Sequence, residues 1–215
     1  LLFRPGGHGS LLTNLERTGA DLVYVKNIDN VVPDRLKEPI VHWRKVLGGV
    51  LLGLQAKAFA ALARLERDAG EDAVVAAAQV LERDLEVATP EGFATWPLER
   101  RRAWVLAKLD RPLRVCGMVR CSGDPGGGPF WVRSASGEVT RQIVETAQVD
   151  TRDPEQRALL GTSTHFNPVD LVCALRDHRG RPYELQKHVD RQAVFIAEKS
   201  HGGRKLRALE HPGLW

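Results

Sequence analysis

The chain has 215 residues, of which 43% are hydrophobic and 27% are charged, values typical of one or two globular domains with a real core. Its 31 basic and 27 acidic residues are interleaved and leave a formal net charge of only +4. This balance suits anionic small molecules bound at local sites and argues against a dedicated nucleic-acid-binding protein.

The first 34 residues predict a segment of an open α/β sheet. Residues 1–3 resemble the end of a strand that begins upstream, so an N-terminal portion is expected to be missing. Ser10 is expected to cap a short helix that stops at Gly19, and residues 22–25 follow as a buried strand parallel to the first. In such folds ligands bind at the carboxyl ends of strands.

Residues 35–110 predict a helical insertion. Apolar residues recur at helical spacing from Pro39 to about Asp68, which indicates one long amphipathic helix. Two further helices are expected at about residues 72–87 and 97–109.

Two features of these helices have alternative interpretations. Gly48, Gly49 and Gly53 interrupt the first helix, and they predict a kink or close packing. The basic residues 100–102 are expected to form a solvated face, with an RNA-binding patch as the weaker alternative.

Residues 111–215 are rich in short β-type segments separated by glycine-containing turns. We expect this part to complete the sheet begun by residues 1–34. The predicted strands are residues 113–119, 130–133, 139–149, 171–175, 183–185 and 195–197.

Residues 4–10, Arg-Pro-Gly-Gly-His-Gly-Ser, form a glycine-rich loop between a predicted strand and a predicted helix. Glycines let backbone N–H groups approach a ligand closely, and a helix N-terminus favours negative charge. Gly6, Gly7, His8 and Gly9 are therefore candidates for binding an anionic or planar ligand, although a tight turn explains the same pattern.

Residues 26–30, Lys-Asn-Ile-Asp-Asn, directly follow the predicted buried strand. The Asp29 carboxylate, flanked by Asn27 and Asn30, can supply oxygen ligands to a divalent cation that bridges phosphates. An Asx turn at the strand end is the alternative.

Polar residues further along the chain are candidates for substrate recognition. Glu145, Gln148, His165 and Asn167 stand among apolar residues, a pattern that suits hydroxyl recognition or ordinary satisfaction of sheet polar groups. Lys199 follows a predicted strand and could neutralise a phosphate, although most such lysines are solvated.

In their order along the chain these motifs resemble those of the UTP–glucose-1-phosphate uridylyltransferases and related UDP-sugar pyrophosphorylases. That family has a Pro–Gly–His–Gly loop and a strand ending in Asn-Ile-Asp-Asn, matched here by residues 5–9 and 27–30. It then has Glu-x-Ala-Gln-Val, matched by residues 145–149, a Phe-Asn pair, matched by residues 166–167, and a phosphate-binding lysine, matched by Lys199.

Over nearly its whole length the chain resembles a bacterial family described as domain of unknown function 4301. The segments that carry this resemblance are RPGGHG, KNIDNVVPD, GGGPFWV, THFNPVDLVC and PGLW.

The wider resemblance implies a nucleotidyltransferase fold, GT-A-like and Rossmann-like, with a mixed sheet divided here into residues 1–34, 35–110 and 111–215. It also implies an enzyme that transfers a uridylyl group from a UTP-like nucleoside triphosphate to a sugar 1-phosphate and releases pyrophosphate. By the same resemblance Gly7, His8 and Gly9 would line the nucleotide and sugar-phosphate cleft, and Asp29 would help to bind Mg²⁺. Asn27 and Asn167 would contact the sugar, and Lys199 would meet phosphate.

The chain also departs from the family pattern. Ser10 replaces an acidic residue, and Pro168 interrupts an asparagine cluster. The lysine-bearing loop that grips the triphosphate is expected upstream, so the site is expected to be incomplete in this chain. The alternative is a non-catalytic nucleotide-sugar-binding or scaffold protein.

The cysteine pattern and the distribution of apolar residues bear on where in the cell the protein is expected. Cys116, Cys121 and Cys173 form neither a CxxC pair nor a metal-ligand spacing, which favours a reducing cytoplasm. No membrane span or secretion signal is expected from the apolar pattern.

Overall fold

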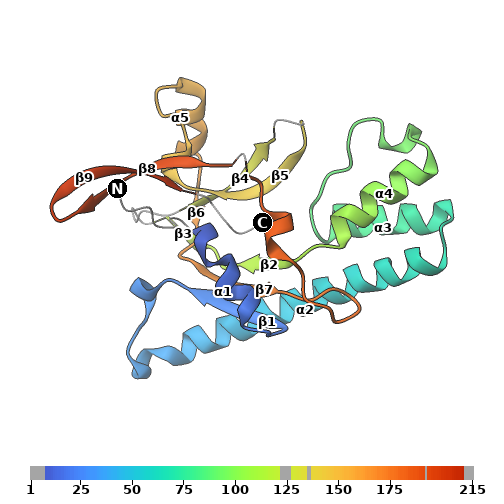
Figure 1. The fold of residues 1–215 in the computed structure, drawn as a ribbon, viewed down its shortest axis with the longest axis horizontal. Helices are drawn as coiled ribbons and strands as arrows, with labels where there is room; N and C mark the ends of the chain where they lie inside the picture. Colours follow the sequence, from blue (N-terminus) through green and yellow to red (C-terminus); the bar gives the residue numbers. More distant parts are fainter. Residues whose placement is uncertain (1–7, 122–126, 135–136, 192, 211–215) are drawn as a thin grey trace.

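The computed structural model describes residues 8–121, 127–134, 137–191 and 193–210 (Figure 1). The expected strand end at residues 1–3 and the glycines Gly6 and Gly7 lie outside these ranges. The helices are α1 (Leu12–Arg17), α2 (Lys37–Arg67), α3 (Glu71–Arg83), α4 (Leu98–Leu109) and α5 (Pro154–Gly161). The strands are β1 (Leu22–Lys26), β2 (Leu113–Cys116), β3 (Val119–Arg120), β4 (Gly128–Arg133), β5 (Val139–Val144), β6 (His165–Phe166), β7 (Asp170–Ala174), β8 (Phe195–His201) and β9 (Arg204–Glu210).

The central sheet has the order β1-β7-β2, with β7 antiparallel to both neighbours (Figure 1). β1 and β2 therefore point the same way on either side of β7. All strand pairs among the described residues are antiparallel, so the structure is a mixed α/β fold with small antiparallel sheets. The parallel partner expected for β1 falls on residues 1–3, outside the described ranges.

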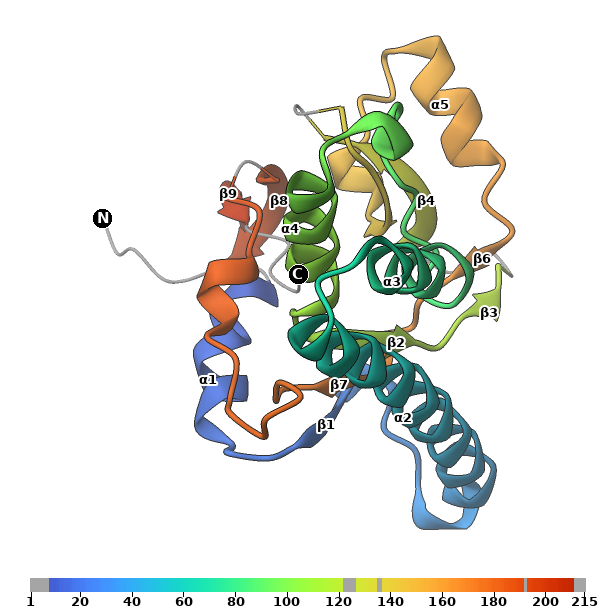
Figure 2. The same cartoon turned by 90° about the vertical axis from the view of Figure 1, so that its right-hand side faces the viewer.

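Strand alternation sends side chains to two separate cores. Val23 and Cys173 face α1, where Leu12 is buried. Leu22 and Val172 face the other side of the sheet and pack with Leu51 of α2. One helix thus covers each face of β7, as the two views of the ribbon show (Figures 1 and 2).

α2 joins this sheet to a separate helical core. The second half of α2 packs against α3 and α4, and these helices bury an apolar cluster between them (Figure 2). The cluster consists of Ala58, Leu62, Leu65, Ala73, Val74, Ala77, Ala78, Leu81, Val105 and Leu109. The helical periodicity of the sequence is therefore confirmed in α2, α3 and α4, with ends within a few residues of those expected.

The glycines of α2 do not break the helix, which runs continuously from Lys37 to Arg67, and of the three only Gly48 is closely packed. A Cβ atom at Gly48 would lie 2.1 Å from the hydroxyl oxygen of Tyr24 on β1. Nothing lies within 4 Å of a Cβ atom built at Gly49 or at Gly53.

Several local expectations are wrong. Ser10 lies inside a 3-10 turn, His8–Leu11, and Leu11 is the residue that precedes α1. Residues 183–185 are not a strand, because Leu185 begins a 3-10 turn that ends at His188. The strand expected at residues 139–149 ends at Val144, and a 3-10 turn follows.

Three helices or strands were not expected from the sequence, namely α5, β6 and β9. Asp153 caps α5 by accepting a hydrogen bond from the Glu155 backbone, and Pro154 occupies the first helical turn. The β8–β9 hairpin turns at Gly202 and Gly203, whose φ values are 57° and 76°. Adjacent residues with positive φ are typical of the tight hairpin turns that suit twisted strands.

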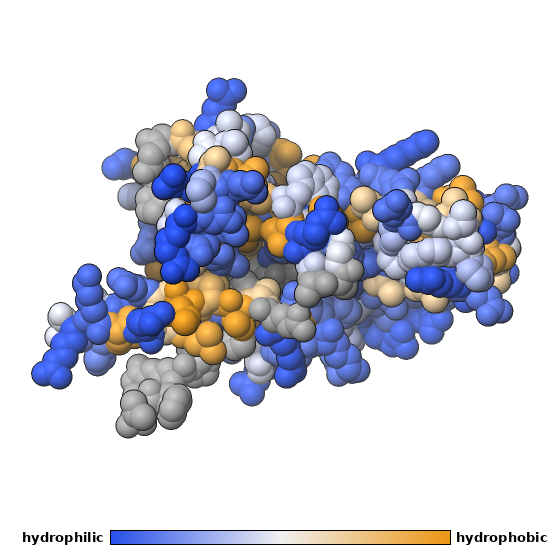
Figure 3. Space-filling view, turned by 90° about the horizontal axis from the view of Figure 1, so that it is seen from above, coloured by the Kyte–Doolittle hydropathy of each residue, from blue (hydrophilic) through white to orange (hydrophobic). Residues whose placement is uncertain are grey.

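The helical segment 34–67 is long and apolar enough to cross a membrane, by length and composition only. A helix that packs in a protein core passes the same test, so the expectation that no segment spans a membrane stays a prediction. Apolar side chains are exposed along its first half, including those of Val41, Trp43, Val46 and Val50. On the face seen in Figure 3, apolar surface lies in several separate patches, near the middle and toward the right-hand side, among hydrophilic surface.

Candidate functional site

Two of the polar segments predicted from the sequence meet at the carboxyl end of β1. The Asn27 backbone N–H donates to the Val169 carbonyl at 3.0 Å, and the Asn30 side-chain amide donates to the Pro168 carbonyl. β1 and β7 are antiparallel with Lys26 opposite Asp170, so the chain leaving β1 faces the chain entering β7. We call residues 26–30 and 167–170 the asparagine junction.

Asn27 shapes the turn that carries Asp29. The Asn27 Oδ1 accepts from the Asp29 backbone N–H at 3.5 Å and opens the 3-10 turn Ile28–Asn30. The Asp29 residue is exposed, and its carboxylate makes no ion pair or hydrogen bond with the described residues. The Asx-type turn and the ligand role are therefore compatible, because the turn uses the backbone of Asp29 and leaves its carboxylate accessible.

Asn167 is a buried residue that holds the junction together. Its Nδ2 donates to the Gly117 carbonyl at 2.6 Å, and its Oδ1 accepts from the Val169 N–H at 2.9 Å. Only 5% of the residue is exposed. Asn167 therefore positions the end of β2 and the start of β7 and does not face solvent.

Val169 has a backbone φ of 55°, which is unusual for a β-branched residue. Its N–H donates to Asn167 and its carbonyl accepts from Asn27, so the conformation is held from both sides. Strained backbone of this kind persists where the surroundings determine it, and it is common at ligand sites.

Asp170 connects three elements through charge. Its carboxylate pairs with the Lys26 Nζ at 2.9 Å and with the Arg44 Nε at 3.1 Å. Sequence reasoning did not single out Asp170 or Arg44, although Asp170 closes the Phe-Asn-Pro-Val-Asp string, and it named Lys26 only as the first residue of the 26–30 motif. These ion pairs fix α2 and β1 against β7 beside the junction.

Few side chains at Asp29 could serve as metal ligands. The described part of the chain holds no group of three or more His, Cys, Asp or Glu side chains arranged to bind a metal. Mg²⁺ commonly keeps several waters and binds through one carboxylate together with substrate phosphates. One accessible carboxylate at Asp29 fits that mode, whereas it does not fit an all-protein metal cage.

The other predicted residues make local contacts. Glu145 and Gln148 form a capping box around the turn Thr146–Gln148, in which Gln148 Oε1 accepts from the Glu145 N–H at 2.8 Å. The Lys199 Nζ pairs with Glu210 at 2.8 Å across the β8–β9 hairpin.

Two histidines and one glycine complete the predicted set. His165 lies on β6, two residues before Asn167, with its Nδ1 2.9 Å from the Thr164 hydroxyl. His8 and Gly9 fall in the first 3-10 turn. The junction therefore gathers Asn27, Asp29, Asn30 and Asn167, with His165 adjacent in sequence.

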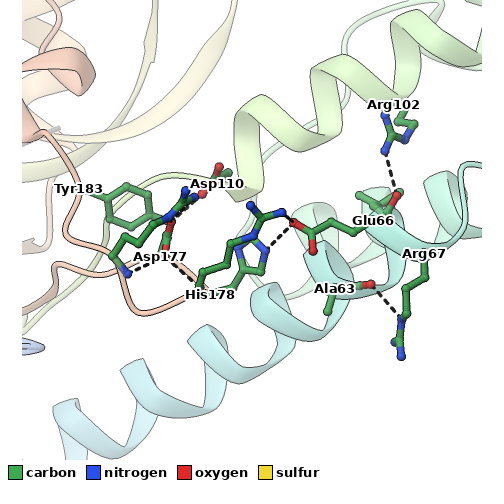
Figure 4. Close-up of polar contacts among 11 residues, drawn as sticks. Ala63, Glu66, Arg67, Arg102, Asp110, Asp177, His178 and Tyr183 are labelled. Atoms are coloured by element: carbon green, nitrogen blue, oxygen red, sulfur yellow. Dashed lines mark hydrogen bonds and ion pairs between the residues drawn. The ribbon is translucent and has the colours of Figure 1, made fainter.

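A second polar cluster fastens the turn after β7 to the helical core (Figure 4). The Asp177 carboxylate accepts from the backbone N–H groups of Arg179 and Arg181 and from the Arg181 side chain. Burial raises the pKa of Asp177, but these hydrogen bonds outweigh it and hold the pKa below its ordinary value. His178 Nε2 lies 2.8 Å from a Glu66 carboxylate oxygen at the end of α2. These contacts hold the turn after β7 against the end of α2, so the role of this cluster is structural.

A cavity of about 640 Å³ lies between the β4–β5 hairpin, α5 and residues 188–190 and 193–194. Of the predicted site residues that the structure describes, only Gln148 lines it. The cavity and the asparagine junction are thus different places in the structure, and the motifs of the sequence point to the junction.

Comparison with known proteins gives one family. A family model described as "Domain of unknown function (DUF4301)" matches residues 1–215. No curated protein and no solved structure matches the chain.

Proposed function

Since the chain belongs to the domain of unknown function 4301 family over residues 1–215, we propose that it carries part of a nucleotidyl-transfer site. In this proposal the asparagine junction binds the metal-bound phosphates and the sugar, and a UTP-like nucleoside triphosphate and a sugar 1-phosphate are the substrates. The proposal adds chemistry to a family whose description names none.

One observation carries the proposal. Two motifs that resemble those of sugar-phosphate uridylyltransferases are far apart in sequence, yet the chain segments that carry them meet where the Asn27 N–H donates to the Val169 carbonyl at 3.0 Å. A buried amide, a strained valine and an ion-paired aspartate hold this contact around an accessible carboxylate. Such support positions a side chain more precisely than a free loop does.

The proposed reaction needs no protein nucleophile. An oxygen of the sugar 1-phosphate attacks the α-phosphorus of the nucleoside triphosphate, and the bond from that phosphorus to the oxygen bridging the β-phosphorus breaks and releases pyrophosphate. Positioning and charge neutralisation supply most of the catalysis in such transfers. Mg²⁺ bound at the phosphates would neutralise their charge, and Asp29 would hold it in place.

The test is pyrophosphate release with a panel of nucleoside triphosphates and sugar 1-phosphates, measured on the protein that carries this chain. We expect Asp29→Asn to lower the rate about a hundredfold, because one strong electrostatic contact is worth on the order of 3 kcal/mol. Asp34→Asn is the matched control, since Asp34 is an exposed carboxylate in the next turn. Its rate should stay within about twofold of the wild type.

A second candidate function is binding of a nucleotide sugar without turnover. The pairing of Lys199 with Glu210 favours it, because this lysine is already neutralised in the structure. Metal-dependent binding of a UDP-sugar, with no pyrophosphate release for any substrate pair, would establish this alternative. Equal activity in folded Asp29→Asn and wild type would contradict the metal role of Asp29.

A further inference from the structure

The cavity of about 640 Å³ has an apolar body and a basic wall. Its size lies within the range of small-molecule pockets, roughly 300–1,000 Å³. The apolar part of the lining includes Phe130, Val132, Ile143, Val144, Leu160 and Val189. Among the described lining residues, Arg111 and Arg133 are cationic, whereas Asp190 is the single carboxylate.

Arg111 is the least satisfied charge at this cavity. It follows α4, is half-buried, and makes no side-chain hydrogen bond or ion pair with any described residue. Two acids beside Arg111 in charge or in sequence have partners of their own, because Glu138 pairs with Lys108 and Asp110 accepts from the Tyr183 hydroxyl at 3.1 Å. Loss of water around the guanidinium lowers the pKa of Arg111 from its ordinary value.

An arginine in this position lowers the stability of the protein when no ligand is bound. A partly buried cation without an ion pair or hydrogen bond loses hydration, and the charge of Glu138 offsets only part of that loss. The planar guanidinium matches the oxygens of a carboxylate, sulfonate or phosphate. An anion bound in the cavity would therefore offset the part of this cost that the fold leaves uncompensated.

We infer that this cavity binds an organic anion with an apolar or aromatic body, whose acidic group is held by Arg111. The body lies against Phe130, Ile143 and Leu160, and the acidic group faces the junction of α4 and β2. The site is separate from the asparagine junction and does not depend on nucleotidyl transfer, since none of Asn27, Asp29 and Asn167 lines the cavity.

His188 supports the same charge preference. It lines the cavity, and its ring packs edge-on against Tyr183 with centroids 5.6 Å apart. Burial lowers the pKa of His188, and the charge of Arg111 lowers it further. His188 is therefore neutral near pH 7 and offers a ring N–H or a lone pair without repelling Arg111.

The test uses two fluorescent probes that share an apolar body. One is 8-anilinonaphthalene-1-sulfonate, and the other is N-phenyl-1-naphthylamine, which lacks the sulfonate. We expect Arg111→Gln to weaken binding of the sulfonate about tenfold to a hundredfold, the usual effect of losing a charged hydrogen bond. Binding of the neutral probe should change less than about threefold, because it makes no such bond.

Two further variants make the test specific. Arg35→Gln removes the same charge from an exposed 3-10 turn and should leave both affinities unchanged. Ala193→Trp fills the cavity from a loop and should abolish binding of both probes, even if Arg111→Gln fails to fold by circular dichroism.

Unchanged sulfonate affinity in folded Arg111→Gln would overturn the inference. Full binding by Ala193→Trp would overturn it as well, because the probe would then occupy another apolar surface. Neither outcome affects pyrophosphate release, which tests Asp29 separately.

Discussion

At the scale of single residues, the left-handed backbone of Val169 is a clear local cost at the asparagine junction. A φ of 55° brings the Cβ atom close to a neighbouring carbonyl oxygen, and the branched side chain makes this worse. Asparagine and glycine adopt this conformation with little penalty. The backbone conformation of Val169 therefore lowers the stability of the protein, and it fixes the position of this residue between Asn27 and Asn167.

We predict that Val169→Asn raises the free energy of unfolding by about 1 kcal/mol, since relief of left-handed strain is worth roughly 1–2 kcal/mol and some apolar burial is lost. Val169→Gly should be close to neutral, because the relief is offset by the greater freedom of glycine in the unfolded chain. Val169→Ala keeps the strain and loses packing, so it should destabilise. Urea denaturation of the three variants checks this order, and an alanine variant more stable than the asparagine variant would refute the strain argument.

The residues of the site were predictable to different degrees. The local sequence pattern predicted the place of Asn27, Asp29 and Asn30 at the carboxyl end of a strand, because these residues follow the strand directly. Asp170 and Val169 could not be found in that way, because an ion pair to Arg44 and a positive φ depend on which strands pair. Arg111 is a similar case, since only tertiary structure shows that its neighbouring acids are engaged by other residues.

At the scale of elements, helical periodicity was the most informative signal. It predicted α2, α3 and α4 because each buries one face in the same core. Short strands were harder, since residues 183–185 have β-type composition but only the Tyr183 N–H bonds to the chain after β7, and a 3-10 turn begins at Leu185. α5 and β9 were missed although Asp153-Pro154 and Gly202-Gly203 are recognisable start and turn signals.

The glycines of α2 allow a matched prediction for this element. Gly49→Ala and Gly53→Ala should each stabilise the protein by about 0.5–1 kcal/mol, because both sites are helical and open. Gly48→Ala should be neutral or destabilising, because its Cβ would collide with the Tyr24 hydroxyl. Thermal unfolding of the three variants gives the comparison. A Gly48→Ala variant as stabilised as the other two would show that Tyr24 does not press on α2.

At the scale of the whole molecule, α2 links two cores that share no other long element. Leu51 belongs to the core beneath the sheet, whereas Leu62 and Leu65 belong to the core with α3 and α4. The first turns of α2 extend beyond the sheet in Figure 2, with Trp43 exposed at 64%. Length and composition therefore describe a membrane-like helix, while the contacts of its second half are those of a protein interior.

The contacts of α2 lead to the last prediction, which concerns partition between water and detergent. We expect the chain to remain in the aqueous phase of a Triton X-114 separation, because inserting the 34–67 segment would expose Leu51, Ala58, Leu62 and Leu65 and dismantle both cores. Breaking those contacts would cost several kcal/mol, at roughly 1.5–3 kcal/mol for each large buried side chain.

The exposed face of α2 provides the control. Trp43→Gln should shorten retention on a phenyl column and leave the melting temperature unchanged, since Trp43 contributes little to either core. Recovery of the folded wild type in the detergent phase would contradict the cytoplasmic location expected from the cysteines and would make α2 a membrane-associated helix. Suppose instead that the wild type is recovered in the aqueous phase and that Trp43→Gln is retained less on the phenyl column. The apolar character of α2 then belongs to its water-exposed surface.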